Sequence, residues 1–276
     1  MPRVTSAALT TYIDSLPDVG TYSLWFGPLD GPPVSMHQAD SPHYAASTMK
    51  LALALAAFRR QDAGELDLDT TVPVHNDFAS AYEGRFAVDR DEDSDPEPWQ
   101  RMGTDVSLRW LAYRSIVRSS NLATNLLLDA VGREAVATTL SHVGTTGSVV
   151  ARGIEDAAAR ESGLQNIVTA ADLARTLQSV ATGRAASADS CRELLDVLAA
   201  QQINDAIPAG LPAGVKVAHK SGWVEGISHD AGIVYPADDP PYILVVCTSS
   251  ALTEQAGRDL IAAGAKASWQ DRAVMV

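Results

Sequence analysis

The N-terminal part of the chain shows one helix-like and two strand-like stretches. Apolar residues at helical spacing predict a helix over residues 4–16. Two β-like runs, Thr21 to Phe26 and Val34 to Gln38, then flank the Gly- and Pro-rich segment 27–31. The pattern predicts two strands that are joined as a hairpin.

A mostly helical stretch follows. From Ser47 the chain carries leucines and Phe58 among alanines, and this run ends at Gly64. Alanine and leucine are strong helix formers, and a helix that is apolar nearly all round is predicted to be buried. Further helices are expected over residues 107–116, 121–130, 133–142, 169–181 and 188–201.

Strand-like patterns return near the C-terminus. Residues 215–221, 229–235 and 242–248 carry β-branched or aromatic side chains between Gly or Pro breaks, and a last helix is expected over residues 252–267. Because short links join these strands, we expect them to pair antiparallel. The first two strands would extend the same sheet, and the terminal helices would cover one face.

The order of strands, helices and strands predicts an α/β protein of the α+β type, with an antiparallel sheet, flanking terminal helices and a mostly helical lobe. We expect a single domain over residues 1–276. Residues 1–43 and 213–276 would form the α/β lobe and residues 44–212 the helical lobe. Catalytic chemistry is expected where the two lobes meet.

Charge narrows the range of partners. The 276 residues contain 34 acidic and 21 basic side chains, giving a formal net charge of −13. Such a surface repels nucleic acid and anionic lipid, so we expect no nucleic-acid or membrane partner. The N-terminus resembles an amphipathic helix more than a signal peptide, which predicts a cytoplasmic protein. Cys191 and Cys247 are expected to be reduced core residues.

The segment from Asp89 to Pro98 is acidic and interrupted by proline, a composition typical of a solvated loop. Its alternating aspartates suggest calcium, but the central glycine and closing glutamate of a helix-loop-helix calcium site are missing. The chain also lacks a Gly-rich phosphate loop and a paired-histidine zinc motif. We therefore expect no metal and no cofactor.

A candidate nucleophile stands at the start of the apolar helix, in Ser47-Thr48-Met49-Lys50. Residues three apart share a helix face, so the Lys50 amine is predicted to lie beside the Ser47 hydroxyl. Burial should lower the pKa of Lys50 and leave a neutral amine to accept the Ser47 proton. The alternatives are a helix cap for Ser47 and a surface lysine for Lys50.

Two further motifs follow in the chain. Ser119-Ser120-Asn121 falls at a break between two predicted helices, where short polar side chains usually cap. Lys220-Ser221-Gly222 ends a predicted strand, and the glycine would let a substrate backbone lie against the strand. A simple turn is the alternative. Each motif is weak alone, but chance is a poor explanation for all three in one chain.

Together the three motifs resemble the class A β-lactamases and the related penicillin-binding DD-peptidases, whose signatures are Ser-X-X-Lys, Ser-X-Asn and Lys-Ser/Thr-Gly. The resemblance covers nearly the whole chain. It implies a β-lactamase/transpeptidase-like fold and a serine hydrolase that forms an acyl-enzyme with a small-molecule substrate, a β-lactam, an ester or a peptide.

The resemblance also assigns roles to residues. Ser47 would be acylated, Lys50 would be its base, and Ser119 would relay a proton to the leaving nitrogen. The substrate would be bound by Asn121 at an amide, by Lys220 and Ser221 at a carboxylate, and by the backbone N–H groups of Ser47 and Trp223 at the oxyanion. Gly222 completes the third motif.

The chain departs from this family at several positions. Glu155 stands near the place of the family's deacylating glutamate, with Asp156 and Glu161 as weaker candidates, but Ala159 replaces the asparagine expected four residues later. Ser120 replaces the usual aspartate of the second motif. No arginine follows Lys220 on the next strand, where His229 is the nearest group that could carry charge.

Trp99, on the acidic segment, is expected either to line the substrate cleft or to be an ordinary packed aromatic. Three functions then remain open: a β-lactamase-like hydrolase, a cytoplasmic esterase or peptidase of the penicillin-binding-protein type, and a catalytically silent binding protein. The intact set of motif residues argues against the third. The oligomeric state is not predicted.

Overall fold

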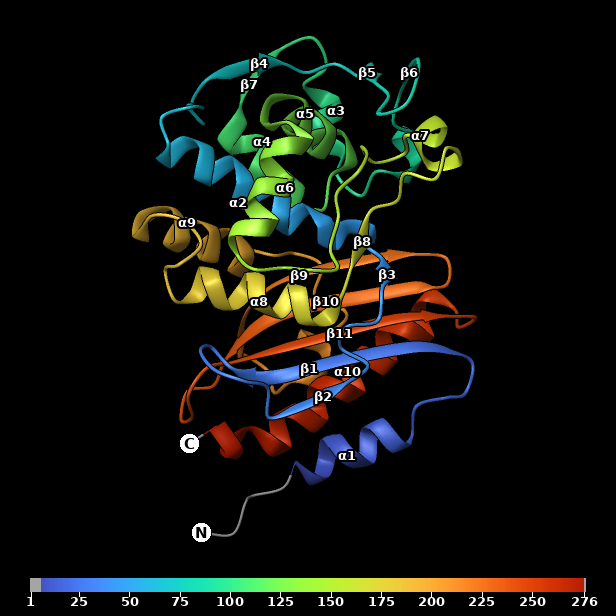
Figure 1. The fold of residues 1–276 in the computed structure, drawn as a ribbon, viewed down its shortest axis with the longest axis vertical. Helices are drawn as coiled ribbons and strands as arrows, with labels where there is room; N and C mark the ends of the chain where they lie inside the picture. Colours follow the sequence, from blue (N-terminus) through green and yellow to red (C-terminus); the bar gives the residue numbers. More distant parts are fainter. Residues whose placement is uncertain (1–5, 276) are drawn as a thin grey trace.

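The computed structural model describes residues 6–275 (Figure 1). Five strands form one sheet in the order β2-β1-β11-β10-β9, and every neighbouring pair is antiparallel. The strands are β1 (Gly20–Pro28), β2 (Ser35–His37), β9 (Lys216–Val224), β10 (Ile227–Tyr235) and β11 (Tyr242–Ser250). This confirms the predicted antiparallel sheet, in which the N-terminal hairpin extends the three C-terminal strands.

Helices cover both faces of the sheet. α1 (Ala7–Asp14) and α10 (Glu254–Asp271) pack together on one face, as predicted for the terminal helices (Figure 1). The first helix is shorter than expected, and residues 4 and 5 of the prediction lie outside the described residues. α8 (Ala170–Ala181) and α9 (Ala188–Ala199) lie on the other face. Both helices were expected in the helical lobe. The boundaries of the two lobes stay a prediction.

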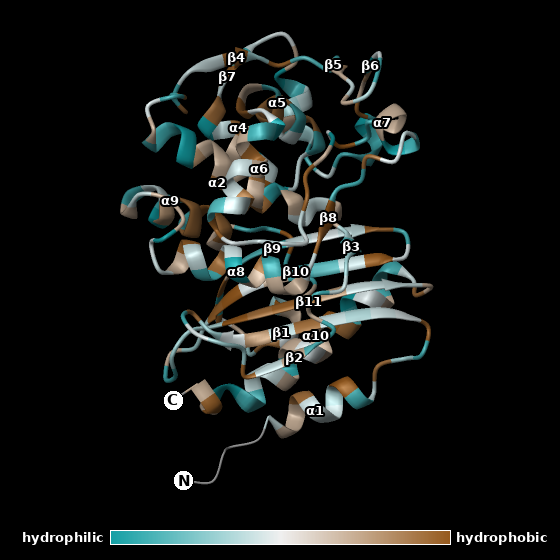
Figure 2. Cartoon of the chain, viewed as in Figure 1, coloured by the Kyte–Doolittle hydropathy of each residue, from teal (hydrophilic) through white to brown (hydrophobic). Residues whose placement is uncertain are grey.

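Alternation along the strands explains this arrangement, because successive side chains of a strand point to opposite faces. On β11, Val246 belongs to the core shared with α1 and α10, whereas Val245 belongs to the larger core beneath α8. Figure 2 shows hydrophobic residues along the central strands of the sheet. Cys191 and Cys247 are buried and unpaired, as predicted.

The remaining helices form the upper part of the molecule in Figure 1, around the predicted buried helix. All residues of that helix from Met49 to Phe58 are buried, Lys50 among them. The helices are α2 (Met49–Asp62), α3 (Pro96–Gln100), α4 (Leu108–Val117), α5 (Asn121–Val131), α6 (Arg133–His142) and α7 (Ala157–Glu161). None of the helices within residues 6–275 is long and apolar enough to cross a membrane.

Short strand pairs join the connecting segments of this part. They are β3 (His43–Tyr44) with β8 (Ile167–Val168), β4 (Thr71–Pro73) with β7 (Asp105–Ser107), and β5 (Phe78–Ala79) with β6 (Arg85–Phe86). Short 3₁₀ turns lie at Ala46–Thr48, directly before α2, at Arg90–Glu92, at Pro208–Gly210, and at Arg272–Met275, directly after α10.

The acidic segment from Asp89 to Pro98 differs from the solvated loop that its composition predicts. It contains a 3₁₀ turn, Arg90–Glu92, and the first half of α3. Asp95 is fully buried and accepts a hydrogen bond of 2.6 Å from Nε of Arg114. The segment is therefore held against α4 by a buried ion pair that composition alone does not indicate.

Candidate active site

A cavity of about 580 Å³ brings the predicted motifs together. Five predicted site residues are in its lining, namely Ser47, Ser119, Asn121, Glu155 and Trp223. Lys50 and Lys220, the lysines of the first and third motifs, are fully buried, and each donates a hydrogen bond to the hydroxyl of the lining residue Ser119. The site therefore joins the turn before α2, the break between α4 and α5, the loop before α7 and strand β9.

Ser47 lies in the 3₁₀ turn Ala46–Thr48, one turn before the α-helix that was expected to begin with it. Gly222 allows β9 to approach this turn, because a Cβ on Gly222 would lie 2.7 Å from the backbone nitrogen of Ser47 and 2.8 Å from that of Thr48. The glycine was expected to make room for a substrate backbone, but the space is filled by the turn that carries Ser47.

Lys50 occupies an apolar helix, and burial lowers the pKa of its amine to about 7, although the nearby carboxylates of Asp93 and Glu155 oppose this shift. Its Nζ donates to the Ser119 carbonyl at 2.6 Å, to Ser119 Oγ at 3.3 Å and to Asn121 Oδ1 at 2.9 Å. No hydrogen bond within residues 6–275 joins Nζ to Ser47, so the direct Ser47–Lys50 contact stays a prediction.

Ser119 is the centre of the polar cluster. Lys220 Nζ donates to its hydroxyl at 3.1 Å and to the Ser221 carbonyl at 2.6 Å. Burial lowers the pKa of Lys220 well below its usual range, and the positive charge of Lys50 adds to this effect, while Asp230 opposes it. Two buried lysines thus converge on one hydroxyl, which favours an arrangement in which at least one amine is neutral.

Glu155 adjoins this cluster through Asn121 and is half-buried. Asn121 Nδ2 donates to its Oε1 at 3.1 Å, and the Asp89 backbone N–H donates to its Oε2 at 2.6 Å. Burial raises the pKa of Glu155, and these two hydrogen bonds oppose the shift. A carboxylate that is partly desolvated and held at the cavity wall can accept a proton from water.

The two weaker candidates for the deacylating carboxylate, Asp156 and Glu161, lie in environments that differ from that of Glu155. Asp156 is fully buried, and its carboxylate accepts hydrogen bonds from Ser80 Oγ and the Ala81 N–H at 2.8 Å each. It therefore anchors the loop. Glu161 is exposed at the end of α7 and is not among the residues that line the cavity.

Backbone strain concentrates at the cavity. Among residues 6–275, four non-glycine residues have a positive φ, and three of them line the cavity: Ala46 at 43°, Ser119 at 58° and Glu155 at 66°. Such conformations cost free energy and persist where the surrounding structure holds them. Ala46 directly precedes Ser47, and the other two positions carry the candidate catalytic side chains of Ser119 and Glu155.

The third motif lies within β9, which continues to Val224, and not at the end of a strand as predicted. Ser221 is buried, and its hydroxyl has no hydrogen-bond partner within the described part of the chain. A buried hydroxyl without a partner is costly, so this group has unused hydrogen-bonding capacity, although Ser221 is not among the residues that line the cavity.

The sequence agrees with this geometry. Residues 6–271 match the model of the beta-lactamase enzyme family. The chain belongs to this family. The β-lactamase L2 of Stenotrophomonas maltophilia is 28% identical over 223 residues, which span 75% of this chain and 66%, slightly less than two thirds, of that relative.

Solved structures of the β-lactamase family share the fold. A β-lactamase from Sphaerobacter thermophilus is 26% identical, with a TM-score of 0.80 over 99% of this chain and 98% of its own. PBP-A, in an acyl-enzyme complex of a mutant with penicillin G, is 22% identical, with a TM-score of 0.78 over 97% and 95% of the two chains. The second likeness concerns the fold alone.

Two residues that the β-lactamase resemblance suggested for the substrate site do not line the cavity. His229 was the nearest candidate charge on the strand after Lys220, but it is buried, and burial lowers its pKa to about 4. It is therefore neutral at pH 7. Trp99 is absent from the lining of the cavity, and its indole N–H donates to Asp93. Of the two alternatives, a cleft-lining side chain and an ordinary packed aromatic, Trp99 is therefore the second.

Sequence reasoning missed Arg258 on α10. Its guanidinium lies 5.1 Å from the centre of the Trp223 ring and pairs with Asp205 and Glu254. Its charge is thus compensated, and its contact fixes the aromatic side chain at the cavity. A cation for the substrate carboxylate was expected on the strand next to Lys220, whereas Arg258 comes from the C-terminal helix α10.

Proposed function

We propose that this β-lactamase-family protein is a serine acyl-transfer hydrolase that opens β-lactam or similar amide or ester bonds through an acyl-Ser47 intermediate. The convergence of Lys50 and Lys220 on the Ser119 hydroxyl, in the wall of a cavity that also contains Ser47, carries the proposal. Buried amines beside a hydroxyl nucleophile supply the proton transfer that acylation requires.

In the acylation step, the neutral Lys50 amine accepts the Ser47 proton while Oγ attacks the substrate carbonyl. As an ammonium group, Lys50 would use three N–H donors on Ser119 and Asn121, so the neutral amine releases one contact and turns a lone pair toward Ser47. The backbone N–H groups of Ser47 and Trp223 would hold the oxyanion, each contributing about 3 kcal/mol.

Collapse of the tetrahedral intermediate breaks the bond to the leaving nitrogen. The Ser119 hydroxyl gives its proton to that nitrogen and is reprotonated through the lysines that contact it. A substrate carboxylate would be bound by Lys220 and by the Ser221 hydroxyl, which has no other partner within residues 6–275. Asn121 would bind an amide of the acyl part.

Hydrolysis of the ester needs water to attack the acyl carbonyl. Glu155 would accept a proton from this water, and that proton would pass to Ser47 Oγ as the ester bond breaks. Ala159, in place of the asparagine expected there, is fully buried in α7, so Asn121 and the Asp89 N–H hold the Glu155 carboxylate instead.

Incubation with a penicillin, followed by intact-mass measurement and an assay of the remaining drug, tests the function. We expect the drug to be consumed, with an adduct of the drug's full mass present early in the reaction. A stable adduct without turnover would indicate an enzyme that acylates only. Intact drug and an unmodified protein would contradict the proposal, and cleavage of p-nitrophenyl esters would then favour the esterase alternative.

Acylation should depend on the state of Lys50. Because the pKa of Lys50 is lowered to about 7, the neutral amine is the main form above pH 7 and falls to about 1% at pH 5. The rate of adduct formation at saturating penicillin should therefore rise about 100-fold from pH 5 to pH 9, with a midpoint near 7. Single-turnover mass measurements give this profile.

The charged groups that face Lys50 are Lys220, Asp93 and Glu155. Loss of the Lys220 charge at high pH would raise KM, and measurement at saturating substrate removes this effect on KM from the profile. Circular dichroism at each pH is the control for folding. A flat profile, or a midpoint near the usual lysine pKa, would exclude Lys50 as the base.

A further inference from the structure

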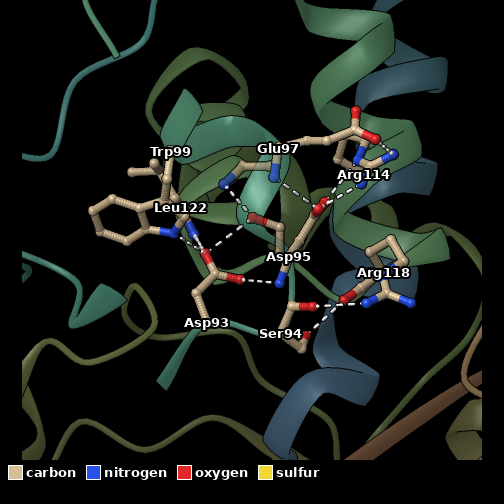
Figure 3. Close-up of polar contacts among 10 residues, drawn as sticks. Asp93, Ser94, Asp95, Glu97, Trp99, Arg114, Arg118 and Leu122 are labelled. Carbon is tan, nitrogen blue, oxygen red and sulfur yellow. Dashed lines mark hydrogen bonds and ion pairs between the residues drawn. The ribbon is translucent and has the colours of Figure 1, made fainter. Parts of the chain in front are cut away.

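The acidic segment, residues 89–98, contacts the strained turn that carries Ser119. The Asp93 carboxylate makes several of these contacts (Figure 3). One oxygen of the Asp93 carboxylate accepts hydrogen bonds from Ser120 Oγ at 3.1 Å, from the Leu122 N–H at 2.9 Å and from Trp99 Nε1 at 3.0 Å. The other accepts from the Asp95 N–H at 3.1 Å. This carboxylate therefore joins α3 to the first residues of α5.

The same segment also holds the chain before Ser119. Ser94 Oγ donates to the Arg118 carbonyl at 2.6 Å, and Arg118 Nη2 donates back to the Ser94 carbonyl at 3.2 Å (Figure 3). Asp93 and Ser94 thus bind the residues on both sides of Ser119, whose φ of 58° needs such support.

A buried ion pair fixes the segment in place. Asp95 is fully buried and binds the guanidinium of Arg114 with both carboxylate oxygens, and Glu97 adds a contact of 3.2 Å to the same guanidinium (Figure 3). Because α4 carries this arginine and ends at the Ser119 turn, the segment and the turn share one anchor.

We propose that Asp93 is a positioning residue for acylation, whose carboxylate holds the turn of Ser119 and Asn121, the two residues that Lys50 Nζ contacts. The proposal rests on the proposed function. Ser120 stands where the resemblance expects an aspartate, and here the carboxylate comes to the turn from Asp93 instead. The negative charge of Asp93 acts on Lys50 against the effect of burial, as that of Glu155 also does.

Asp93→Asn tests this role, because it removes the charge and keeps the size of the side chain. We expect adduct formation at saturating penicillin and high pH to slow by about 10-fold or more, since the turn loses its anchor. We also expect the midpoint of the pH profile to move to lower pH. Asp91→Asn removes the same charge from an exposed neighbour with no side-chain contact to the turn, and it should behave as the wild type.

A second measurement needs no substrate. The chain has four lysines, at positions 50, 216, 220 and 266. The ζ-nitrogen of each can therefore be followed by ¹⁵N NMR against pH. In folded Asp93→Asn the Lys50 titration should move to lower pH, and an unchanged titration would overturn the proposal. If the wild type forms no adduct, the proposed function fails while this titration still decides the effect of Asp93.

Trp99→Phe covers the case in which Asp93→Asn does not fold. It removes one donor to the Asp93 carboxylate and keeps the charge. Adduct formation should slow by about 3-fold or more while the Lys50 titration stays in place. A wild-type rate in this variant would overturn the positioning role.

Discussion

Ser47→Ala is expected to form no penicillin adduct and to lose at least about 10⁴-fold in the rate of β-lactam opening. Removal of the attacking oxygen eliminates covalent catalysis, and only the effects of binding and of the oxyanion donors remain. The Ser47 hydroxyl makes no hydrogen bond within residues 6–275, so its loss should change the free energy of unfolding by less than about 0.5 kcal/mol. Intact mass after minutes of incubation and initial rates of drug loss measure the two effects.

Ser35→Ala is the matched control. Ser35 lies on the edge strand β2, does not line the cavity and is partly exposed like Ser47. This variant should form the adduct at the wild-type rate. Mass labelling in Ser47→Ala would show that another hydroxyl is the nucleophile, and peptide mapping would then identify it.

The elements that sequence predicted well are those whose pattern is local. The buried α2 follows from its uninterrupted apolar residues, and a lysine within such a helix has few routes to water, so the lowered pKa of Lys50 could be foreseen. The β-branched and aromatic residues of β10 and β11, with the short link between the two strands, likewise predicted the sheet. Helix ends were less certain, because the turn at Ser47 is fixed by its contact with Gly222 on a distant strand.

The acidic segment shows why other features could not be predicted. Composition indicates solvation when acidic residues are counted together, but Asp95 is buried because Arg114 reaches it across 19 residues of chain. Separation in sequence likewise hid the contact of Arg258 with Trp223. Pairing across the fold decides which charges are buried, and a single sequence does not report that pairing.

Glu155→Gln tests the proposed role of Glu155 in hydrolysis of the acyl-enzyme. Glutamine keeps the length of the side chain and one carbonyl oxygen to accept the hydrogen bond from Asn121, but it cannot take a proton from water. We expect acylation to continue and hydrolysis of the adduct to slow by about 10²-fold or more, so that acyl-Ser47 accumulates. Intact mass against time after a pulse of penicillin measures both steps.

Glu161→Gln, an exposed glutamate on α7 outside the cavity lining, is the control and should turn over as the wild type. The wild-type deacylation rate should also fall as pH decreases through the pKa of Glu155, because only the ionised carboxylate accepts a proton. Burial raises that pKa, so this fall should begin at a higher pH than for an exposed glutamate. If Glu155→Gln hydrolyses its adduct at the wild-type rate, then Glu155 serves to hold Asn121 and Asp89, and water reaches the ester with another base.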